Sequence, residues 1–487
     1  MKIPKEELIA ILSQFNPWWR RETIPDLPQW HRGAFQELMH WIESPPAWRA
    51  IMLSGPRQVG KTTLLLQAIQ KLIDSGVPPA NILYATFDHP ICKLGGLHAV
   101  LEAWRELEPK ANGPEYLFLD EAQFIQDIGT WVKHQVDFFK NKRIIFTGSA
   151  TPLIHTNQES GVGRWHTLRI ATLSFYEYLQ IKKINLPNIP MIDTINHLFD
   201  CAPNKLYRMS EAATALIGHF HEYLIRGGFP QTVLVENITQ SQRLLREDII
   251  DKILKRDMTA LFGVRRIIEL EQLFIFLCMH DGGMQDTQTI SKELGIAKQT
   301  VQNFIDLFES TYLIYRLPPF GYGKEILRGK NKLYLSDPAI APAVLMKGKT
   351  ILEDPRALSQ CVETAVIGHL WSHSSSNQAK FSYWRNQKAK EVDLIIEMNN
   401  AIIPFEIKYQ SETIQMRDIP GLIDLCSQKP SILHGYIITK NPQDIGFLQE
   451  KLTHKTYIKI PASLFCYWLG ASEFIQKNIL TQDTHQN

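Results

Sequence analysis

The stretch that decides the fold runs from Arg49-Ala-Ile-Met-Leu-Ser54 into Gly55-Pro-Arg-Gln-Val-Gly60-Lys61-Thr62. Residues 49–54 are mainly apolar and predict a buried strand, whereas residues 62–72 have the periodicity of a helix. The segment between them fits G-x-x-x-x-G-K-[ST], whose backbone N–H groups and helix N-terminus attract phosphate. The spacing predicts a nucleotide-binding loop, and the alternative is a chance Gly-Lys-Thr turn. The predicted nucleotide-binding residues are Gly55, Pro56, Arg57, Gln58, Val59, Gly60, Lys61, Thr62 and Thr63.

Two further strand ends extend this site. Leu117-Phe-Leu-Asp120-Glu121 is an apolar strand that ends in two acids, so we expect Asp120 beside Mg²⁺ and Glu121 as the base that polarises water. Lys61 would contact the β and γ phosphates, and Thr62 would bind Mg²⁺. The strand at 143–147 leads to Ser149, and Ser149 or Thr147 is expected to contact the γ-phosphate or water; ordinary turn chemistry is the alternative. These strand ends predict an ATPase that uses ATP and Mg²⁺.

The order of predicted elements places this site in an α/β fold. Strands at 49–54, 82–87, 116–119 and 143–147 alternate with helix-compatible segments, which predicts a parallel sheet with helices on both faces. We expect four regions along the chain. They are an N-terminal helical segment (1–48), a P-loop ATPase core (49–200), a helical lid with a winged helix (201–345) and a C-terminal α/β domain (346–487).

Composition narrows the class of protein. Of 487 residues 44% are hydrophobic and 21% charged, which excludes a largely disordered chain. Lys plus Arg (52) minus Asp plus Glu (50) gives +2, so any basic surface must be local. No apolar run reaches the roughly 18–20 residues that cross a bilayer. The six cysteines have no CxxC spacing, and the N-terminus has no signal-peptide pattern, so we expect a reduced, cytoplasmic protein without membrane contact.

A helix-turn-helix pattern lies in the middle of the chain. Residues 287–295 predict a short helix that ends in Gly295, and residues 297–308 predict a second helix. A hairpin after them would be a wing, and residues 298–332 hold six basic and three acidic side chains. We therefore expect DNA contact, with a purely structural packing role as the alternative. The predicted DNA-binding residues are Lys298, Gln299, Gln302, Arg316 and Arg328, and Lys324, Lys330 and Lys332 share the wing.

The C-terminal strands carry a carboxylate pattern. Asp393 and Glu406 lie on strands that a hairpin can pair, and alternation puts Glu406 and Lys408 on one face. This pattern resembles the PD-(D/E)XK nuclease signature, and Glu363 matches the acid often found on the preceding helix. The resemblance implies a metal site of Glu363, Asp393 and Glu406, with Lys408 as a partner that is not a ligand. The alternative is a vestigial fold with a salt-bridged Asp–Lys pair.

The motifs in order resemble a known family. GPRQVGKTT, LFLDEAQ, FTGSAT and GRWHTLRIATLSFYEYL are similar to bacterial and archaeal AAA-type ATPases whose C-terminal half is a domain of unknown function with a nuclease-like end. The resemblance implies an AAA+ core and a homo-oligomer, in which a ring would place an arginine of one subunit against the γ-phosphate of the next. Arg164 is the matching position and Arg226 a second candidate; a structural ion pair or helix cap is the alternative for both.

Three functions follow from these patterns. The first is an ATP-hydrolysing, oligomeric DNA remodeller or translocase that acts on branched or single-stranded DNA. The second is an ATP-gated nuclease or defence effector that cleaves at the Asp393 site. The third is a nucleotide-dependent regulatory switch that processes no DNA. We rank the remodeller first because the ATPase motifs are more specific than the nuclease pattern.

Overall fold

The computed structural model describes residues 3–107, 112–149, 163–186, 188–192, 198–199, 201–321, 330–374, 379–398, 401–450 and 455–479. The chain forms two compact units. Unit 1 comprises residues 1–171, 310–312 and 474–487, and unit 2 comprises residues 172–309 and 313–473. Among the described helices, none is long and apolar enough to cross a membrane.

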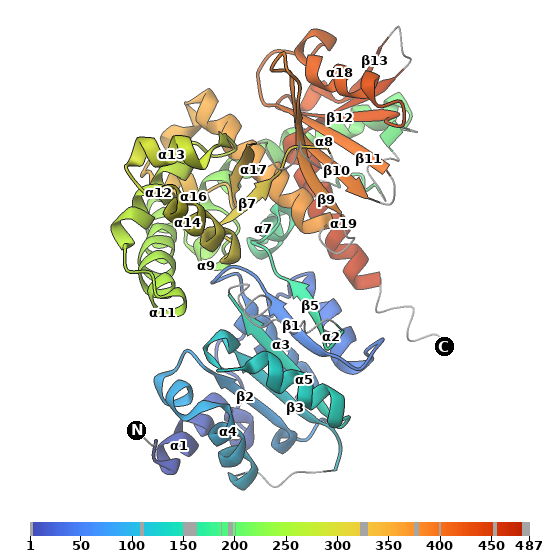
Figure 1. The fold of residues 1–487 in the computed structure, drawn as a ribbon. Coiled ribbons are helices and arrows are strands. Elements are labelled where there is room, and N and C mark those ends of the chain that lie inside the picture. The colour runs from blue at the N-terminus through green and yellow to red at the C-terminus, as the bar shows by residue number, and fades with distance from the viewer. Residues whose placement is uncertain are drawn as a thin grey trace. The chain divides into compact units, whose positions relative to one another are not determined.

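Unit 1 is built on a parallel five-stranded sheet flanked by helices (Figure 1). Its strands follow the order β2-β3-β4-β1-β5. They are β1 (Ala50–Ser54), β2 (Ile82–Thr86), β3 (Glu115–Asp120), β4 (Lys142–Gly148) and β5 (Trp165–Arg169). The helices are α1 (Lys5–Phe15), α2 (Ala34–Glu43), α3 (Lys61–Asp74), α4 (Pro90–Leu107) and α5 (Ile128–Phe138). The predicted α/β class and the four predicted strands are confirmed.

The burial of β1 explains why its sequence is a nearly continuous run of apolar residues. All five of its residues are buried, as expected for a central strand covered on both faces. Met52 belongs to a core that includes Val100 of α4 and Val132 of α5. Leu8 and Leu12 of α1 join the same core. Helix α1, which lies in the predicted N-terminal segment 1–48, is therefore part of the packing of unit 1.

Unit 2 begins with helices and a small antiparallel sheet. The helices are α7 (Phe175–Ile181), α8 (Pro203–Arg226), α9 (Pro230–Leu234), α10 (Ile238–Glu247), a π-helical stretch (Asp248–Asp257), α11 (Met258–Phe262), α12 (Ile267–Met279), α13 (Thr287–Leu294), α14 (Lys298–Ser310) and α16 (Ile340–Val344). The sheet has the order β6-β8-β7, with β6 (Met284–Gln285), β7 (Ile314–Leu317) and β8 (Asn331–Leu335). Gly295 caps α13 with φ 67°, as a tight turn between two helices requires. Helices α13 and α14 are thus joined by a tight turn and are followed by the strands β7 and β8.

A six-stranded mixed sheet completes unit 2, with the order β13-β14-β12-β11-β10-β9 (Figure 1). Its strands are β9 (Lys380–Arg385), β10 (Glu391–Met398), β11 (Ala401–Lys408), β12 (His434–Thr439), β13 (Gly446–Gln449) and β14 (Thr456–Pro461). The helices are α17 (Pro355–Ser374), α18 (Pro420–Gln428) and α19 (Ala462–Ile479). Val392 and Leu422 of α18 share a buried cluster, whereas Phe465 of α19 packs against Phe405. Helices therefore cover the sheet around β10 and β11.

The compact units do not follow the predicted domain boundaries at 200 and 345. The division falls after Ala171, and residues on both sides of 345 belong to unit 2. Backbone bonds explain this grouping, because Phe320 N–H donates to Tyr383 O (2.6 Å) and Tyr383 N–H donates to Pro318 O (3.0 Å). The chain after β7 thus continues the ladder of β9, so the small sheet and the large sheet are joined.

Candidate functional site

The predicted nucleotide-binding loop joins β1 to α3 in a conformation that few residue types adopt. Gly60 has φ 93° and Gln58 has φ 61°, so the loop turns its amides inward before α3 begins at Lys61. Gly55 lies so close to the chain after β5 that an added Cβ would meet Ile170 O at 2.0 Å. The strand–loop–helix context that the motif needs is therefore present.

Lys61 lies over this loop. Its side chain is buried, and Nζ donates to the carbonyl oxygens of Gly55 (2.9 Å) and Pro56 (2.6 Å). The ammonium thus stands at the loop mouth and at the N-terminus of α3, where both favour an anion. This position fits the predicted contact with phosphate.

The carboxylate of Asp120, at the end of β3, accepts hydrogen bonds from three hydroxyl groups. Thr62 Oγ1 donates to Oδ2 (2.8 Å), Thr147 Oγ1 to Oδ1 (2.6 Å) and Tyr84 Oη to Oδ2 (3.0 Å). Burial raises the pKa of the Asp120 carboxyl, Glu121 raises it further, and the three donors lower it. Thr62 and Asp120 present adjacent oxygens beside the loop, which is the donor set that Mg²⁺ prefers. The residues here fit a nucleotide-bound Mg²⁺.

Glu121 follows in a left-handed conformation with φ 52°. Its N–H donates to Thr147 Oγ1 (2.8 Å), which fixes the backbone between β3 and β4. Glu121 Oε2 accepts hydrogen bonds from Ser149 Oγ (3.1 Å) and from Gln123 Nε2, and Gln123 Nε2 also donates to Ser149 Oγ (2.9 Å). The two hydroxyls that the sequence left as alternatives therefore have different partners, because Thr147 binds Asp120 and Ser149 binds Glu121.

Three residues of this site were missed by sequence reasoning. Tyr84 and Gln123 contact the two acids, and Arg32 Nη1 donates to Val59 O (2.8 Å) and to Ala171 O (2.8 Å). Arg32 thus connects the nucleotide-binding loop to the chain just after β5. Gln123 stands in the quoted LFLDEAQ stretch and was the detectable signal; Tyr84 and Arg32 lie in no motif.

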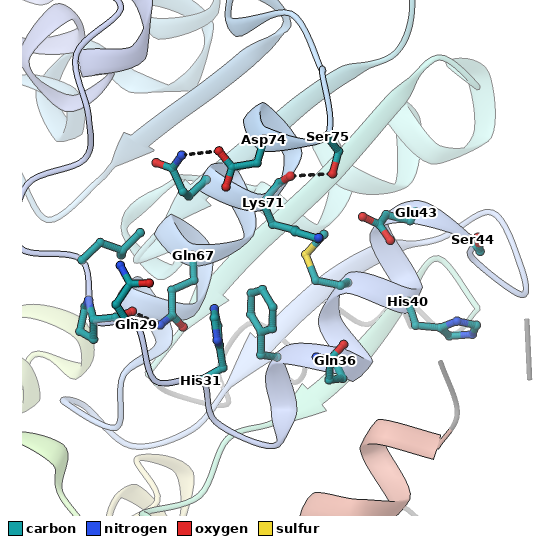
Figure 2. A pocket seen from close by; sticks show the side chains of 15 residues that line it. Gln29, His31, Gln36, His40, Glu43, Ser44, Gln67, Lys71, Asp74 and Ser75 are labelled. Carbon is teal, nitrogen blue, oxygen red and sulfur yellow. Dashed lines mark hydrogen bonds between the residues drawn. The ribbon is translucent and has the colours of Figure 1, made fainter. Parts of the chain in front are cut away.

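A pocket of about 740 Å³ lies beside α2 and the second half of α3 (Figure 2). Gln36 and His40 line it from α2, and Gln67 and Lys71 from α3. No residue of the loop 55–63 is part of its lining. The volume of this pocket therefore does not mark the nucleotide site, whose chemistry lies at the other end of α3.

The two candidate arginine fingers are both engaged within the chain. Arg164 Nε lies 3.1 Å from Asp137 Oδ1, in an ion pair that is partly exposed. Arg226 is buried, with Nε 2.7 Å from Glu222 Oε1, and its guanidinium also donates to the carbonyls of Val235 and Glu236. These contacts of Arg226 fit the structural ion pair that was the alternative to a role as a finger.

The C-terminal acids come together, but a lysine lies among them. Lys332 Nζ from β8 lies 2.5 Å from Glu391 Oε1, 3.2 Å from Asp393 Oδ1 and 3.7 Å from Glu363 Oε1. The predicted pairing of β10 and β11 is confirmed, because Ile407 N–H donates to Asp393 Oδ2 (2.9 Å). Lys408 Nζ lies 2.6 Å from Glu406 Oε1, so these two side chains share a face as expected. Lys332, expected on a DNA-binding wing, is instead the buried centre of this cluster.

Charge balance shows whether the cluster fits a divalent metal. Burial, together with a smaller contribution from the charge of Asp393, raises the pKa of Glu363 to about 7 and that of Glu406 to about 8. Burial opposes the charge of Lys332, but neighbouring Tyr334, Asp393 and Glu363 more than offset it and raise its pKa. Among the residues that the structure describes, no three or more His, Cys, Asp or Glu side chains are arranged to hold a metal ion. The expected metal site does not fit this geometry.

The helix-turn-helix region presents a mixed surface. Lys298, Gln299 and Asn303 of α14 are exposed, and Gln302 is half-buried. Arg316 Nη2 lies 2.6 Å from Asp306 Oδ1 and 2.9 Å from Glu309 Oε2, so two acids already neutralise it. Arg328 and Lys324 lie outside the described residues. Within the described part of the chain, Lys298 on the exposed first turn of α14 makes no ion pair of this kind.

Family comparisons divide the chain into three segments. Residues 47–179 match a family described as an AAA domain. Residues 217–350 and 358–462 match two domains of unknown function, DUF8612 and DUF4143. The first segment contains β1 to β5 with the loop, Asp120 and Glu121, so the fold there is that of an AAA-type P-loop domain.

The chain is similar to several uncharacterized proteins. One from Haemophilus influenzae is 26% identical over 298 residues, which cover 59% of this chain and 66% of that protein. One from Methanocaldococcus jannaschii is 25% identical over 59% of this chain and 60% of its own length. One from Mycobacterium tuberculosis is 24% identical over 79% of this chain and 76% of its own. The matches thus span less than two thirds of the first two relatives.

Two solved structures that are similar to this chain share little sequence with it. The Orc1 protein of Aeropyrum pernix, solved in complex with DNA, is 12% identical, with a TM-score of 0.31 over 66% of this chain and 95% of that one. The RuvB branch migration motor of Thermotoga maritima is 14% identical, with a TM-score of 0.27 over 65% of this chain and 90% of that one. Likeness of this degree places no ligand or partner on this chain.

Proposed function

We propose that this chain hydrolyses ATP at the carboxyl ends of β1, β3 and β4. The observation that carries the proposal is the hydrogen-bonded group at these strand ends. Thr62 and Thr147 donate to Asp120 (2.8 and 2.6 Å), and Ser149 donates to Glu121 (3.1 Å). Side chains from the ends of β3 and β4 and from the first turn of α3 thus meet beside a phosphate-binding loop. A site that only stored nucleotide would not need a second, separately positioned carboxylate.

Each side chain has a role that follows from its position. Lys61 and the loop amides would hold the β and γ phosphates, and Thr62 with Asp120 would hold Mg²⁺. Bound Mg²⁺ would neutralise charge that develops on the phosphate oxygens. Glu121 would accept a proton from water, while Ser149 and Gln123 orient its carboxylate through the hydrogen bonds already described. Thr147 fixes the spacing of the two acids because it bonds both residues.

A pair of substitutions tests the proposal. Lys61→Ala should weaken nucleotide binding and abolish hydrolysis, whereas Glu121→Gln should keep binding and lose about 100-fold or more in turnover. Lys71→Ala is the matched control, since Lys71 lies on the same helix but is exposed and near its other end. The measurements are phosphate release and binding of a fluorescent ATP analogue. Turnover of Glu121→Gln at the wild-type rate would remove Glu121 as the base.

We further propose that hydrolysis drives a remodeller that contacts DNA through α14. Lys298, Gln299 and Asn303 are exposed on its first turns, where groove contacts need donors. If Lys298 contacts phosphate, Lys298→Ala should reduce the slope of log affinity against log salt by roughly one, and Lys349→Ala should not. Anisotropy with duplex, forked, four-way and single-stranded DNA measures this, and ATPase rates with the same panel report coupling. Absence of binding at low salt would favour the regulatory switch.

Self-assembly with Arg164 as an interfacial finger is part of the same proposal. Arg164 is partly exposed and its ion pair with Asp137 is of the kind that contributes little stability, so it can exchange partners. Arg164→Ala should leave nucleotide binding near normal and lower turnover. Mixing Arg164→Ala protein with Lys61→Ala protein should restore activity if the finger acts between subunits. Failure to recover activity in assemblies verified by sedimentation would exclude that role.

A further inference from the structure

The carboxylate edge of unit 2 is built around the side chain of Lys332. β8 runs antiparallel to β6 and β7 in the small sheet, and Lys332 is its second residue. The side chain is 4% exposed and lies against acids of α17 and β10. A lysine is rarely buried to this extent unless it is paired, so its partners explain its position.

Three carboxylates surround the ammonium group of Lys332. Lys332 Nζ donates a hydrogen bond to Asp393 Oδ1 (3.2 Å) and forms ion pairs with Glu391 Oε1 (2.5 Å) and Glu363 Oε1 (3.7 Å). Tyr334, two residues along β8, donates its hydroxyl to Glu363 Oε1 (2.5 Å). The small sheet therefore supplies both a cation and a hydrogen-bond donor to the same acids.

The charged side chains around Lys332 nearly neutralise one another, which leaves little negative charge to attract a further cation. The cluster holds four acids, Glu363, Glu391, Asp393 and Glu406, and three cations, namely Lys332, Lys408 and Arg385. A divalent ion entering beside them would meet Lys332 at close range, where two positive charges repel strongly.

We propose that Lys332 is the resident cation of this edge and excludes divalent metal from Glu363, Asp393 and Glu406. The wing strand β8 thus closes a site that would otherwise take a hard divalent ion through carboxylate oxygens. One atom indicates where that ion would bind: Glu406 Oε2 is buried and makes no hydrogen bond to the described residues. The closed edge joins the winged-helix sheet to the six-stranded sheet by ion pairs and does not cleave DNA.

The wild-type protein provides the first test. Nucleotide-free protein is titrated with Mn²⁺ and free ion is measured by electron paramagnetic resonance. We expect no site tighter than roughly 1 mM at the acids, because the charge of Lys332 opposes entry. Saturable Mn²⁺ binding in the micromolar range that Asp393→Asn abolishes would overturn the proposal. Asp120→Asn removes Mn²⁺ binding at the nucleotide site and so distinguishes it from binding at the acids of unit 2. The outcome is therefore independent of ATP hydrolysis.

Substitution of Lys332 provides the second test. Lys332→Met keeps the length of the side chain and removes its charge, so one Mn²⁺ should bind about 100-fold more tightly than to wild type. Lys332→Met/Asp393→Asn should lose this gain, and Lys330→Ala, an exposed lysine next to the same strand, should behave like wild type. Circular dichroism verifies folding, and Lys332→Met/Glu391→Gln serves as a charge-balanced second variant. If folded Lys332→Met and folded Lys332→Met/Glu391→Gln bind Mn²⁺ with the same affinity as wild type, Lys332 does not exclude the metal.

Discussion

Gly55 is the residue on which two strands of unit 1 converge. An added Cβ would meet Ile170 O at 2.0 Å, so Gly55→Ala must displace either the loop or the chain after β5. We expect the variant to lose about 2–3 kcal/mol of stability and most of its nucleotide affinity. Gly218→Ala is the control, because Gly218 lies within α8 with open space at its Cβ, and should gain about 0.5–1 kcal/mol. Urea unfolding and nucleotide binding measure both, and a wild-type affinity for Gly55→Ala would contradict the contact.

Tyr84 tests how much the hydrogen-bond group around Asp120 depends on each donor. Tyr84→Phe removes one of three donors and leaves Thr62 and Thr147 in place. We expect a loss of about 1 kcal/mol in stability and less than about tenfold in turnover, whereas Asp120→Ala should abolish turnover. Tyr116→Phe, on the neighbouring strand, is the matched control. A Tyr84→Phe enzyme as inactive as Asp120→Ala would mean that Tyr84 has a role in the reaction itself.

At this scale the sequence predicted residues that act through local motifs. Lys61, Asp120 and Glu121 belong to a loop and a strand end whose spacing is diagnostic, and in the structure Asp120 accepts a hydrogen bond from Thr62 and Glu121 accepts one from Ser149. Lys332 was predicted as a surface residue, because its partners lie 31 to 61 positions further along the chain. Ion pairs between residues so far apart in the chain depend on how the two sheets pack. Local sequence patterns do not specify that packing.

At the scale of secondary-structure elements, the buried Arg226 connects the end of α8 to the chain that follows α9. Arg226 pairs with Glu222 on the same helix and donates to two carbonyls beyond α9. Arg226→Ala should lower the stability of unit 2 by about 3 kcal/mol, since it leaves Glu222 with one cation fewer and the carbonyls without a donor. Arg164→Ala should cost less than about 1 kcal/mol. Hydrogen exchange of α8 and urea unfolding distinguish them; a stable but inactive Arg226→Ala would restore the finger hypothesis.

Elements with strong patterns were predicted, and weak ones were missed. The strand at 82–87 and the helix at 357–371 correspond to β2 and α17. β5 was not predicted, because Trp-His-Thr-Leu-Arg has only two apolar side chains and its burial is partial. β12 and β14 lie beyond the last motif that the sequence offered. Their burial depends on β11, to which β12 pairs in parallel over a long connection.

At the scale of the molecule, the two acidic sites differ in what neutralises them. The acids of unit 1 receive hydrogen bonds from hydroxyl groups and one amide side chain, which leaves room for an external cation. The acids of unit 2 are paired with lysines of the chain itself. ATP hydrolysis and metal-dependent cleavage were both predicted from carboxylates at strand ends. The difference between them lies in counter-charges that come from distant parts of the chain.

Buried acids also determine how stability changes with pH. Asp281 accepts hydrogen bonds from Leu335 N–H (2.8 Å) and Thr364 Oγ1 (2.6 Å), and burial raises its pKa to about 7. A folded-state pKa above the unfolded value means that the folded chain binds the proton more tightly. The stability from this group is therefore present below about pH 4 and is lost as pH rises through 7.

Asp281→Asn isolates that contribution, because the other titrating groups are common to both proteins. The free energy of unfolding of the wild type should fall more between pH 5 and pH 8 than that of Asp281→Asn. The stability of the variant relative to the wild type should therefore increase as pH rises. Hydrogen exchange of α17 at several pH values, together with urea unfolding, reports the stability of unit 2. Glu363 and Glu406, whose pKa values are raised to about 7 and about 8, should leave a similar residual slope in the variant. Parallel pH profiles for the two proteins would show that Asp281 is ionised in the folded state at every pH tested, which its burial opposes.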